Sequence, residues 1–203
     1  MGLQEIRSIR YSNSGKYIAC SFLFIQLWDQ NSKITSDLIV NDAESLKICF
    51  SKCDKYLASA CSDGCIRIWN IENAEITYII MAHAEVYQNP FFGLSMDMFD
   101  RVHDLITALE YSNCGRYLLS AGNDGYVKII DLVTQNSFYE IKAHMQKVLS
   151  ASFSIDGNWI ISTGGGGIRV WDFKQILAKK KHILKIEKSE CEKLIMVSED
   201  RHE

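Results

Sequence analysis

Four cysteines close together in the sequence carry the clearest chemical signal in the chain. They form two CxxxC pairs, Cys49 with Cys53 and Cys61 with Cys65, and thiolates at such spacing can hold a structural zinc ion. The segment between the pairs argues against this site, because residues 56–61 have the pattern of a strand and, at about 3.3 Å per residue, keep Cys53 and Cys65 roughly 20 Å apart. We therefore interpret the four as small buried hydrophobic residues and expect neither a metal nor another cofactor.

Catalytic motifs are missing from the sequence. The chain has no GxSxG nucleophile elbow, no HExxH zinc motif and no pair of carboxylates in a recognisable catalytic setting, and its five histidines are scattered. The glycine run at 164–167 lacks the GxxxxGKS/T pattern of a phosphate-binding loop and is expected to form a hairpin turn with positive φ angles. We therefore expect no enzymatic activity.

One stretch of about 20 residues, AEVYQNPFFGLSMDMFDRVHD, concentrates aromatic and methionine side chains. Such residues are enriched at the centres of protein interfaces. Either they bind a partner, or they pack back onto the rest of the protein, since large exposed apolar patches are rare. A short helix over residues 95–102 fits the stretch. The candidate protein-binding residues are Tyr87, Phe91, Phe92, Met96, Met98 and Phe99.

A basic run, Lys179-Lys180-Lys181-His182, has the charge to contact the phosphates of RNA or acidic lipid headgroups. No aromatic residues accompany it for base stacking and the formal net charge is -3, so we interpret it as a solvated loop and expect neither a nucleic-acid nor a membrane partner. The start MGLQEIRSIRYS lacks the apolar core of a signal peptide, and no stretch reaches the roughly 18 apolar residues of a membrane span. Because seven cysteines are an odd number, we expect reduced thiols and a cytoplasmic or nuclear location.

The elements that must position these residues come from an internal repeat of four units. In each unit a first strand ends at a serine, a turn with Gly or Asp follows, and a second strand, a hairpin and a third strand complete the pattern. The equivalent serines, Ser12, Ser51, Ser112 and Ser154, are 39, 61 and 42 residues apart. The long step equals one period of about 40–45 residues plus the apolar insertion at about 84–105.

The third strand of each unit alternates apolar and charged residues. This period of two is typical of β-strands and not of helices. Strands this short cannot bury an apolar face alone, so neighbouring units must stack, and each buried Ile or Val then contributes roughly 1.5–3 kcal/mol. The alternating segments are Ile66-Arg67-Ile68, Val127-Lys128-Ile129 and Ile168-Arg169-Val170.

The pairs Trp28-Asp29, Trp69-Asn70 and Trp171-Asp172 recur at matching places in the repeat. Together with the hairpins, they make residues 6–172 similar to the WD-repeat (WD40) family. The resemblance implies an all-β fold, a WD40-type β-propeller with one four-stranded blade per unit. Residues 1–172 would then form four blades, with the insertion between the second and the third.

In this family a hydrogen-bonded chain of His, Ser or Thr, Asp and Trp often fastens each blade, and the resemblance carries that chain over incompletely. The first unit has only Trp28. A buried polar group without a partner costs about 1–3 kcal/mol, so we expect modest stability. The matching residues are Ser59, Asp63 and Trp69 in the second unit, with Asn41 for the His; Ser120 and Asp124 in the third, with His83 or His103 and with Ile130 for the Trp; and His144, Ser162 and Trp171 in the fourth, with no Asp.

Residues 173–203 are expected to contain a linker or last strand and the start of an incomplete fifth blade, with residues 194–197 as its first strand and Ser198 as its serine. A helix over residues 173–190 is the alternative, because FKQILAKKKHILKIEK contains no helix breaker. Four blades and one strand form a partial or open propeller, whose edges and apolar end faces invite association. Either a partner chain or a second copy completes it, or the sequence is a fragment.

A propeller without catalytic motifs implies a binding role. We expect a non-enzymatic scaffold or adaptor that mediates protein–protein interactions in a multiprotein complex. One alternative is the substrate-receptor subunit of a ubiquitin ligase, although the Trp-Asp-x-Arg signature of one such group is absent at Trp28 and Trp171. The other is a subunit of an RNA-processing complex, in which the lysine run would contact phosphates.

Overall fold

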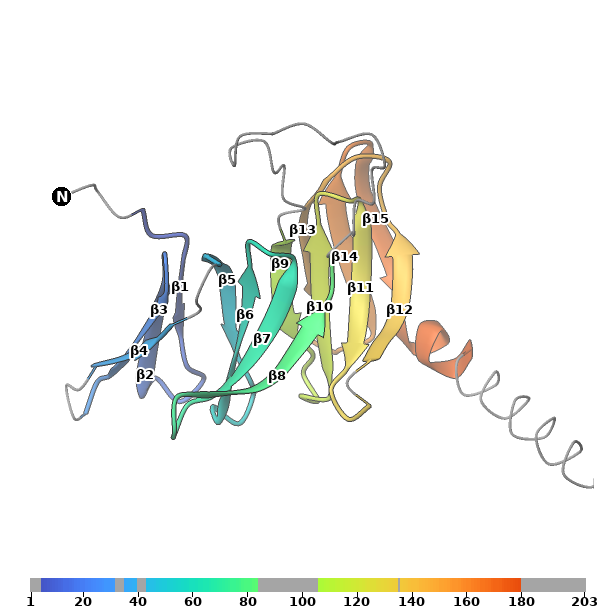
Figure 1. The fold of residues 1–203 in the computed structure, drawn as a ribbon. Coiled ribbons are helices and arrows are strands. Elements are labelled where there is room, and N and C mark those ends of the chain that lie inside the picture. Colours follow the sequence, from blue (N-terminus) through green and yellow to red (C-terminus); the bar gives the residue numbers. More distant parts are fainter. Residues whose placement is uncertain (1–4, 32–34, 40–42, 84–105, 135, 180–203) are drawn as a thin grey trace, which may run out of the picture.

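The computed structural model describes residues 5–31, 35–39, 43–83, 106–134 and 136–179. These residues form four antiparallel sheets, in each of which the strands follow one another in chain order (Figure 1). The predicted all-β fold of four blade-like sheets is confirmed, whereas the predicted first strand of a fifth blade, at 194–197, lies outside the described residues. Sheet A contains β1 (Ser8–Tyr11), β2 (Tyr17–Ser21), β3 (Ile25–Asp29) and β4 (Thr35–Leu38); sheet B contains β5 (Ser45–Phe50), β6 (Tyr56–Cys61), β7 (Cys65–Asn70) and β8 (Glu75–Met81); sheet C contains β9 (Ile106–Tyr111), β10 (Tyr117–Gly122), β11 (Tyr126–Asp131) and β12 (Asn136–Lys142); and sheet D contains β13 (Val148–Phe153), β14 (Trp159–Gly164) and β15 (Gly167–Asp172).

The repeated serine has a local role in each sheet. Its hydroxyl accepts a hydrogen bond from the backbone N–H of the aromatic residue that begins the second strand, and so closes the turn between the first two strands. The residue three positions after the serine has a positive φ. It is Gly15, Gly115 or Gly157 in three of the sheets, and Asp54, with φ 55°, in sheet B. The four hydrogen bonds are Tyr17 to Ser12 (2.9 Å), Tyr56 to Ser51 (3.1 Å), Tyr117 to Ser112 (3.0 Å) and Trp159 to Ser154 (2.9 Å).

The sheets stand side by side in a row, with sheet A at one end and sheet D at the other (Figure 1). The first strand of each sheet packs on the sheet before it: β5 contacts β1 and β2, β9 contacts β5 and β6, and β13 contacts β9, β10 and β11. Within the described residues the row does not close into a ring.

The core is divided into three clusters, one in each junction between neighbouring sheets. The two central sheets are buried on both faces: on β10, Leu118 packs into the junction of sheets B and C, and its neighbour Leu119 into the junction of sheets C and D. At the ends of the row the outward faces are exposed. Residues 168–170 form part of β15 as predicted, but Ile168 and Val170 are not buried: they lie on the outward face of sheet D and are 72% and 58% exposed.

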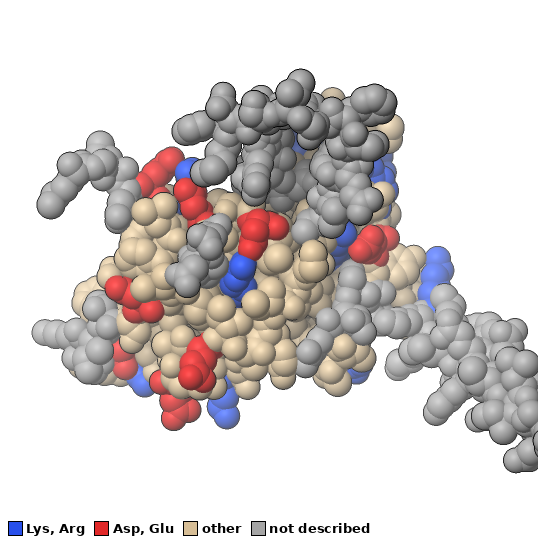
Figure 2. All heavy atoms as spheres, viewed as in Figure 1, with Lys and Arg blue, Asp and Glu red and all other residues tan. Residues whose placement is uncertain are grey.

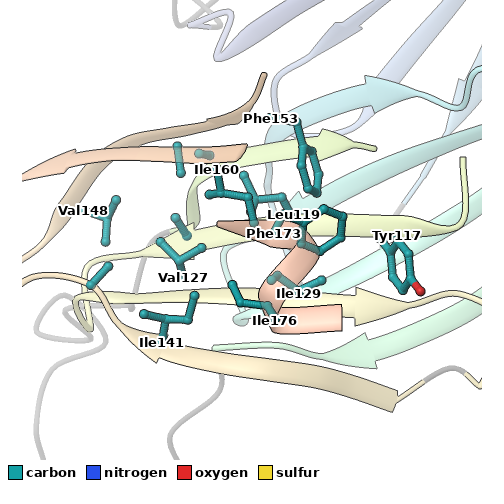
Figure 3. Packing of buried hydrophobic residues seen from close by; sticks show 14 residues of the cluster. Tyr117, Leu119, Val127, Ile129, Ile141, Val148, Phe153, Ile160, Phe173 and Ile176 are labelled. Atoms are coloured by element: carbon teal, nitrogen blue, oxygen red, sulfur yellow. The ribbon is translucent and has the colours of Figure 1, made fainter. Parts of the chain in front are cut away.

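Residues 173–179 form a short helix, the helical alternative, where a fourth strand of sheet D was the other expectation. Asp172 begins it, because its carboxylate accepts a hydrogen bond from the backbone N–H of Gln175 (2.9 Å). Phe173 and Ile176, three residues apart, share one helix face and are buried in the junction of sheets C and D (Figure 3). The described residues contain no helix long and apolar enough to cross a membrane.

Candidate functional site

A buried polar network joins sheets B and C at the end of the chain's second sheet. His83 follows β8, and its Nδ1 lies 2.7 Å from the carboxylate of Asp124, while its Nε2 lies 3.0 Å from the hydroxyl of Ser120. Because a carboxylate only accepts, Nδ1 carries a hydrogen and donates to Asp124, and the Ser120 hydroxyl is the hydrogen-bond partner of Nε2. Of the two histidines that the sequence left open, the structure places His83 in this network; His103 lies outside the described residues.

The order Ser–His–Asp is also that of a serine nucleophile with its base and orienting acid. Here Ser120 is 0% exposed and His83 is 2% exposed, so no substrate carbonyl can reach the serine oxygen. The three side chains come from β8's end, from β10 and from the turn after it. The network therefore links neighbouring strands through buried hydrogen bonds, and its role is structural.

The Asp124 carboxyl makes this network sensitive to acid. Burial acts to raise the pKa of Asp124, but the hydrogen bond and charge of His83 outweigh burial, so that the pKa lies below its ordinary value. The stabilisation from Asp124 is therefore complete above the unfolded-state pKa of about 3.9 and is lost as the pH falls below it. We expect the urea midpoints of the wild type and Asp124→Asn to differ at pH 7 and to converge as the pH is lowered below about 3.9. Parallel midpoints across this range would contradict the assignment.

In sheets B and D the tryptophan N–H is the donor that closes the network. Trp69 Nε1 donates to Ser59 (2.8 Å), and Trp171 Nε1 donates to Ser162 (3.2 Å), which also lies 3.0 Å from Nε2 of His144. No carboxylate follows in the turn of sheet D, and Nδ1 of His144 is buried without a hydrogen-bond partner among the described residues.

Asp63 of sheet B has a different partner from its counterpart Asp124. It forms a two-pronged ion pair with Arg67, with the shorter contact at 2.6 Å, and Asn41 lies outside the described residues. In sheet A, Trp28 is 44% exposed. Trp28 pairs with Ile18, and Cys20, two residues further along β2, takes the position that Ser59 and Ser162 have in their sheets, so this position has no hydroxyl.

The candidate protein-binding residues Tyr87 to Phe99 lie outside the described residues, but both ends of their insertion are described. His83, at one end, is held so closely that a Cβ on Gly122 would lie 2.9 Å from its Nδ1. Ile106, at the other end, is 1% exposed and pairs with Gly122 in the ladder of β9 and β10. The residues that flank the insertion, His83 and Ile106, therefore both lie beside Gly122 of sheet C. The insertion is recognisable in the sequence, but its anchoring at His83 depends on contacts with residues about 40 positions away, Gly122 and Asp124.

The cysteines are distributed across different environments. Cys49 and Cys61 are buried, as expected, and burial raises the pKa of both thiols. The expectation is wrong for Cys53, which lies with the exposed Lys52 and Lys55 on the turn after β5, and it is only partly met by Cys65, which is half-buried. The surface in Figure 2 carries acidic and basic side chains interspersed, with no large field of one sign on that face.

Comparison with known families decides the fold's identity. The family described as WD domain, G-beta repeat matches residues 41–70, 99–131 and 135–172. These ranges cover the first three strands of sheet B and all of sheets C and D. This chain belongs to the WD-repeat family. Sheet A lies outside the matched ranges, yet it has the same four-stranded order as sheets B and C and the same serine-closed turn as all three sheets that follow it.

Several WD-repeat and related proteins are similar to this chain over part of their length. Nuclear distribution protein PAC1 of Yarrowia lipolytica is 32% identical over 114 residues, which are 52% of this chain and 25% of that protein. Transcription initiation factor TFIID subunit 5 of Caenorhabditis elegans is 25% identical over 61% of this chain and 22% of its own length. WD repeat-containing protein SL1-17 of Schistosoma mansoni is 26% identical over 82% of this chain and 50% of its own length. This WD-repeat chain thus spans half or less of these relatives.

Proposed function

We propose that this WD-repeat chain is a non-enzymatic scaffold or adaptor that holds other proteins in a multiprotein complex, in the cytosol or the nucleus. Relatives named as a subunit of TFIID and as a component of the Set1 complex support a role in assemblies. The Ser–His–Asp group is sealed in the core, which favours binding over catalysis.

The observation that carries the proposal is the anchoring of the insertion. An apolar segment between residues 84 and 105 starts at His83 and ends at Ile106, and both of these buried residues meet at Gly122. Residue types such as its Phe and Met dominate the centres of protein interfaces. A rigid sheet that presents such a segment from one fixed point is suited to binding a partner.

The test is a pair of substitutions in the insertion. Phe91→Ser with Phe92→Ser should reduce the amount of co-purified partner at least tenfold while leaving the thermal midpoint within about 2 °C, because removal of two interface anchors costs several kcal/mol of binding. Quantitative mass spectrometry after affinity purification of the full chain gives the measurement. Ile155→Ser is the matched control, since Ile155 is 98% exposed on another turn.

A drop in the thermal midpoint together with unchanged capture would instead show that the two phenylalanines pack onto the protein. The same purification separates the alternatives: cullin-linked adaptors in the captured set would indicate a ubiquitin-ligase receptor, and capture that depends on RNA would indicate an RNA-processing complex.

We also propose that a second copy or a partner covers the exposed outer faces of sheets A and D. A light-scattering mass of one chain, with no captured partner, would contradict this.

A further inference from the structure

The three junctions between sheets are built from the same three sequence positions. Each uses the aromatic residue that begins the second strand of one sheet, the aromatic residue that ends the first strand of the next, and the residue that follows the third strand of that next sheet. The trios are Tyr17, Phe50 and Ile71 between sheets A and B; Tyr56, Tyr111 and Leu132 between sheets B and C; and Tyr117, Phe153 and Phe173 between sheets C and D.

The junction of sheets C and D shows the trio completely filled. The ring of Phe173 lies 5.4 Å from that of Tyr117, edge to face at 88°, and 5.2 Å from that of Phe153 (Figure 3). These are favourable aromatic geometries. As a result Tyr117 is 8% exposed and Phe173 is 3% exposed.

At the junction of sheets B and C the third ring is missing. Leu132 takes the position of Phe173 and is only half-buried, and Tyr56, the counterpart of Tyr117, is 36% exposed. A cleft of about 360 Å³ opens between these residues, with Ile68 and Tyr78 also lining it. This volume is within the range of small-ligand sites.

The turns beside the cleft also lack a clamp that the other two junctions have. Asn13 Nδ2 donates to the backbone carbonyl of Ser51 (2.9 Å), and its counterpart Asn113 donates to that of Ser154 (3.3 Å), so each turn is tied to the next sheet. The equivalent residue of sheet B is Lys52, which is exposed and lines the cleft. The junction of sheets B and C therefore lacks both the third aromatic ring of the junction of sheets C and D and the asparagine hydrogen bond of the other two junctions.

One of the residues that line the cleft has a hydrogen-bonding group without a partner among the described residues. Tyr111 is 4% exposed, and its buried hydroxyl has no hydrogen-bond partner among the described residues. By contrast, the larger cleft between sheets A and B is lined by groups that are already paired, such as Lys16 with Asp29 (3.5 Å). An unpaired buried hydroxyl is destabilising until an acceptor reaches it.

We propose that the cleft between sheets B and C binds an aromatic side chain from an extended segment of a partner protein. The ring fills the place that Phe173 fills in the next junction, and a backbone carbonyl of the segment accepts a hydrogen bond from the Tyr111 hydroxyl. Lys52 at the opening favours a carboxylate beside the ring. This proposal rests on the scaffold function, but its site lies on the turns after β5 and β9, at the opposite ends of the strands from His83 and the insertion.

Two thiols of the cleft make occupancy measurable. Cys53 and Cys114 both line it and both are exposed. A hydrogen bond with Ser51 holds the pKa of Cys53 below its ordinary value. For Cys114, burial acts to raise the pKa, but hydrogen bonds with Ser112 and backbone groups outweigh it, and the pKa is again lowered. Because both thiols are exposed and their pKa values are lowered, they should react with iodoacetamide faster than the buried thiols Cys49 and Cys61.

The experiment measures alkylation of each cysteine of the full chain by mass spectrometry, with N-acetyl-L-phenylalaninamide as the probe. A ligand of this size should bind with a Kd on the order of 1 mM. At several times that concentration we expect alkylation of Cys53 and Cys114 to slow at least threefold, and that of Cys20, a half-buried thiol of sheet A, to stay unchanged. N-acetyl-L-leucinamide, which has the same backbone without a ring, is the matched control probe and should protect neither thiol.

Three variants test the assignment of the parts. Leu132→Phe supplies the missing ring, so it should abolish protection and raise the thermal midpoint. Tyr111→Phe removes the donor and should weaken binding about fivefold while also raising the midpoint, because an unpaired hydroxyl has been removed. Lys52→Asn installs the clamp of the other junctions and should reduce protection, whereas Lys55→Asn in the same turn should not.

Several results would overturn the proposal. They are the absence of protection in the wild type, equal protection in Leu132→Phe or Lys52→Asn, and equal slowing of Cys20. Equal protection by toluene, which has no peptide acceptor, would assign the cleft to free aromatic compounds instead of a protein segment. The variant Phe91→Ser with Phe92→Ser should leave cleft protection unchanged, so loss of the insertion's partner and failure of this cleft are distinguishable.

Discussion

Replacement of His83 by alanine is expected to lower the free energy of unfolding by about 3 kcal/mol. The substitution leaves the Asp124 carboxylate, whose side chain is 7% exposed, and the fully buried Ser120 hydroxyl without the imidazole that both contact at 3.0 Å or less. Since a domain has only about 5–15 kcal/mol of stability, this is a large fraction of the total. Urea unfolding monitored by tryptophan fluorescence at pH 7 gives the measurement.

The double variant His83→Ala with Asp124→Asn is the matched control. Removal of the unpaired charge should restore part of the loss, so the two substitutions should be less than additive. The single variant should also reduce capture of the insertion's partner, because His83 fixes one end of that segment. A loss below about 1 kcal/mol would show that the network contributes little beyond an ordinary exposed hydrogen bond.

Phe173→Ala should have an effect of similar size, with about 3–5 kcal/mol lost on unfolding. The ring is 3% exposed and packs on Tyr117 and Phe153 from the two sheets of its junction, so its removal leaves a cavity that neither sheet can close without moving. The short helix at 173–179 should detach as well, because Ile176 is its other buried contact. Thermal unfolding and hydrogen exchange of β13–β15 measure the two effects.

Lys174→Ala is the control for that experiment, because Lys174 is exposed on the same helix and its substitution keeps the Asp172 cap. Equal destabilisation by both variants would mean that helix propensity, and not the aromatic trio, stabilises this end of sheet D. A fall of less than about 1 kcal/mol for Phe173→Ala would mean that the junction collapses around the missing ring.

Much of the fold could be predicted from short-range patterns. The serines at 12, 51, 112 and 154 mark hairpins because each bonds the backbone of a residue five positions later in its own turn. Ser162 and Trp171 could be assigned to one network for a similar reason, since neighbouring strands of one hairpin place them together. The choice between His83 and His103 could not be made, because both are distant in sequence from Ser120.

The sequence by itself determined the sheets of this protein. Strand period, turn residues and serine-closed hairpins depend on interactions within about 20 residues, so they can be predicted from short stretches of sequence. Only the tertiary structure decided what lies between the sheets. Whether Leu132 or Phe173 fills a junction, whether Lys52 or Asn113 stands at its turn, and where His83 anchors the insertion depend on contacts between side chains roughly 40 residues apart, which meet only once neighbouring repeats have stacked.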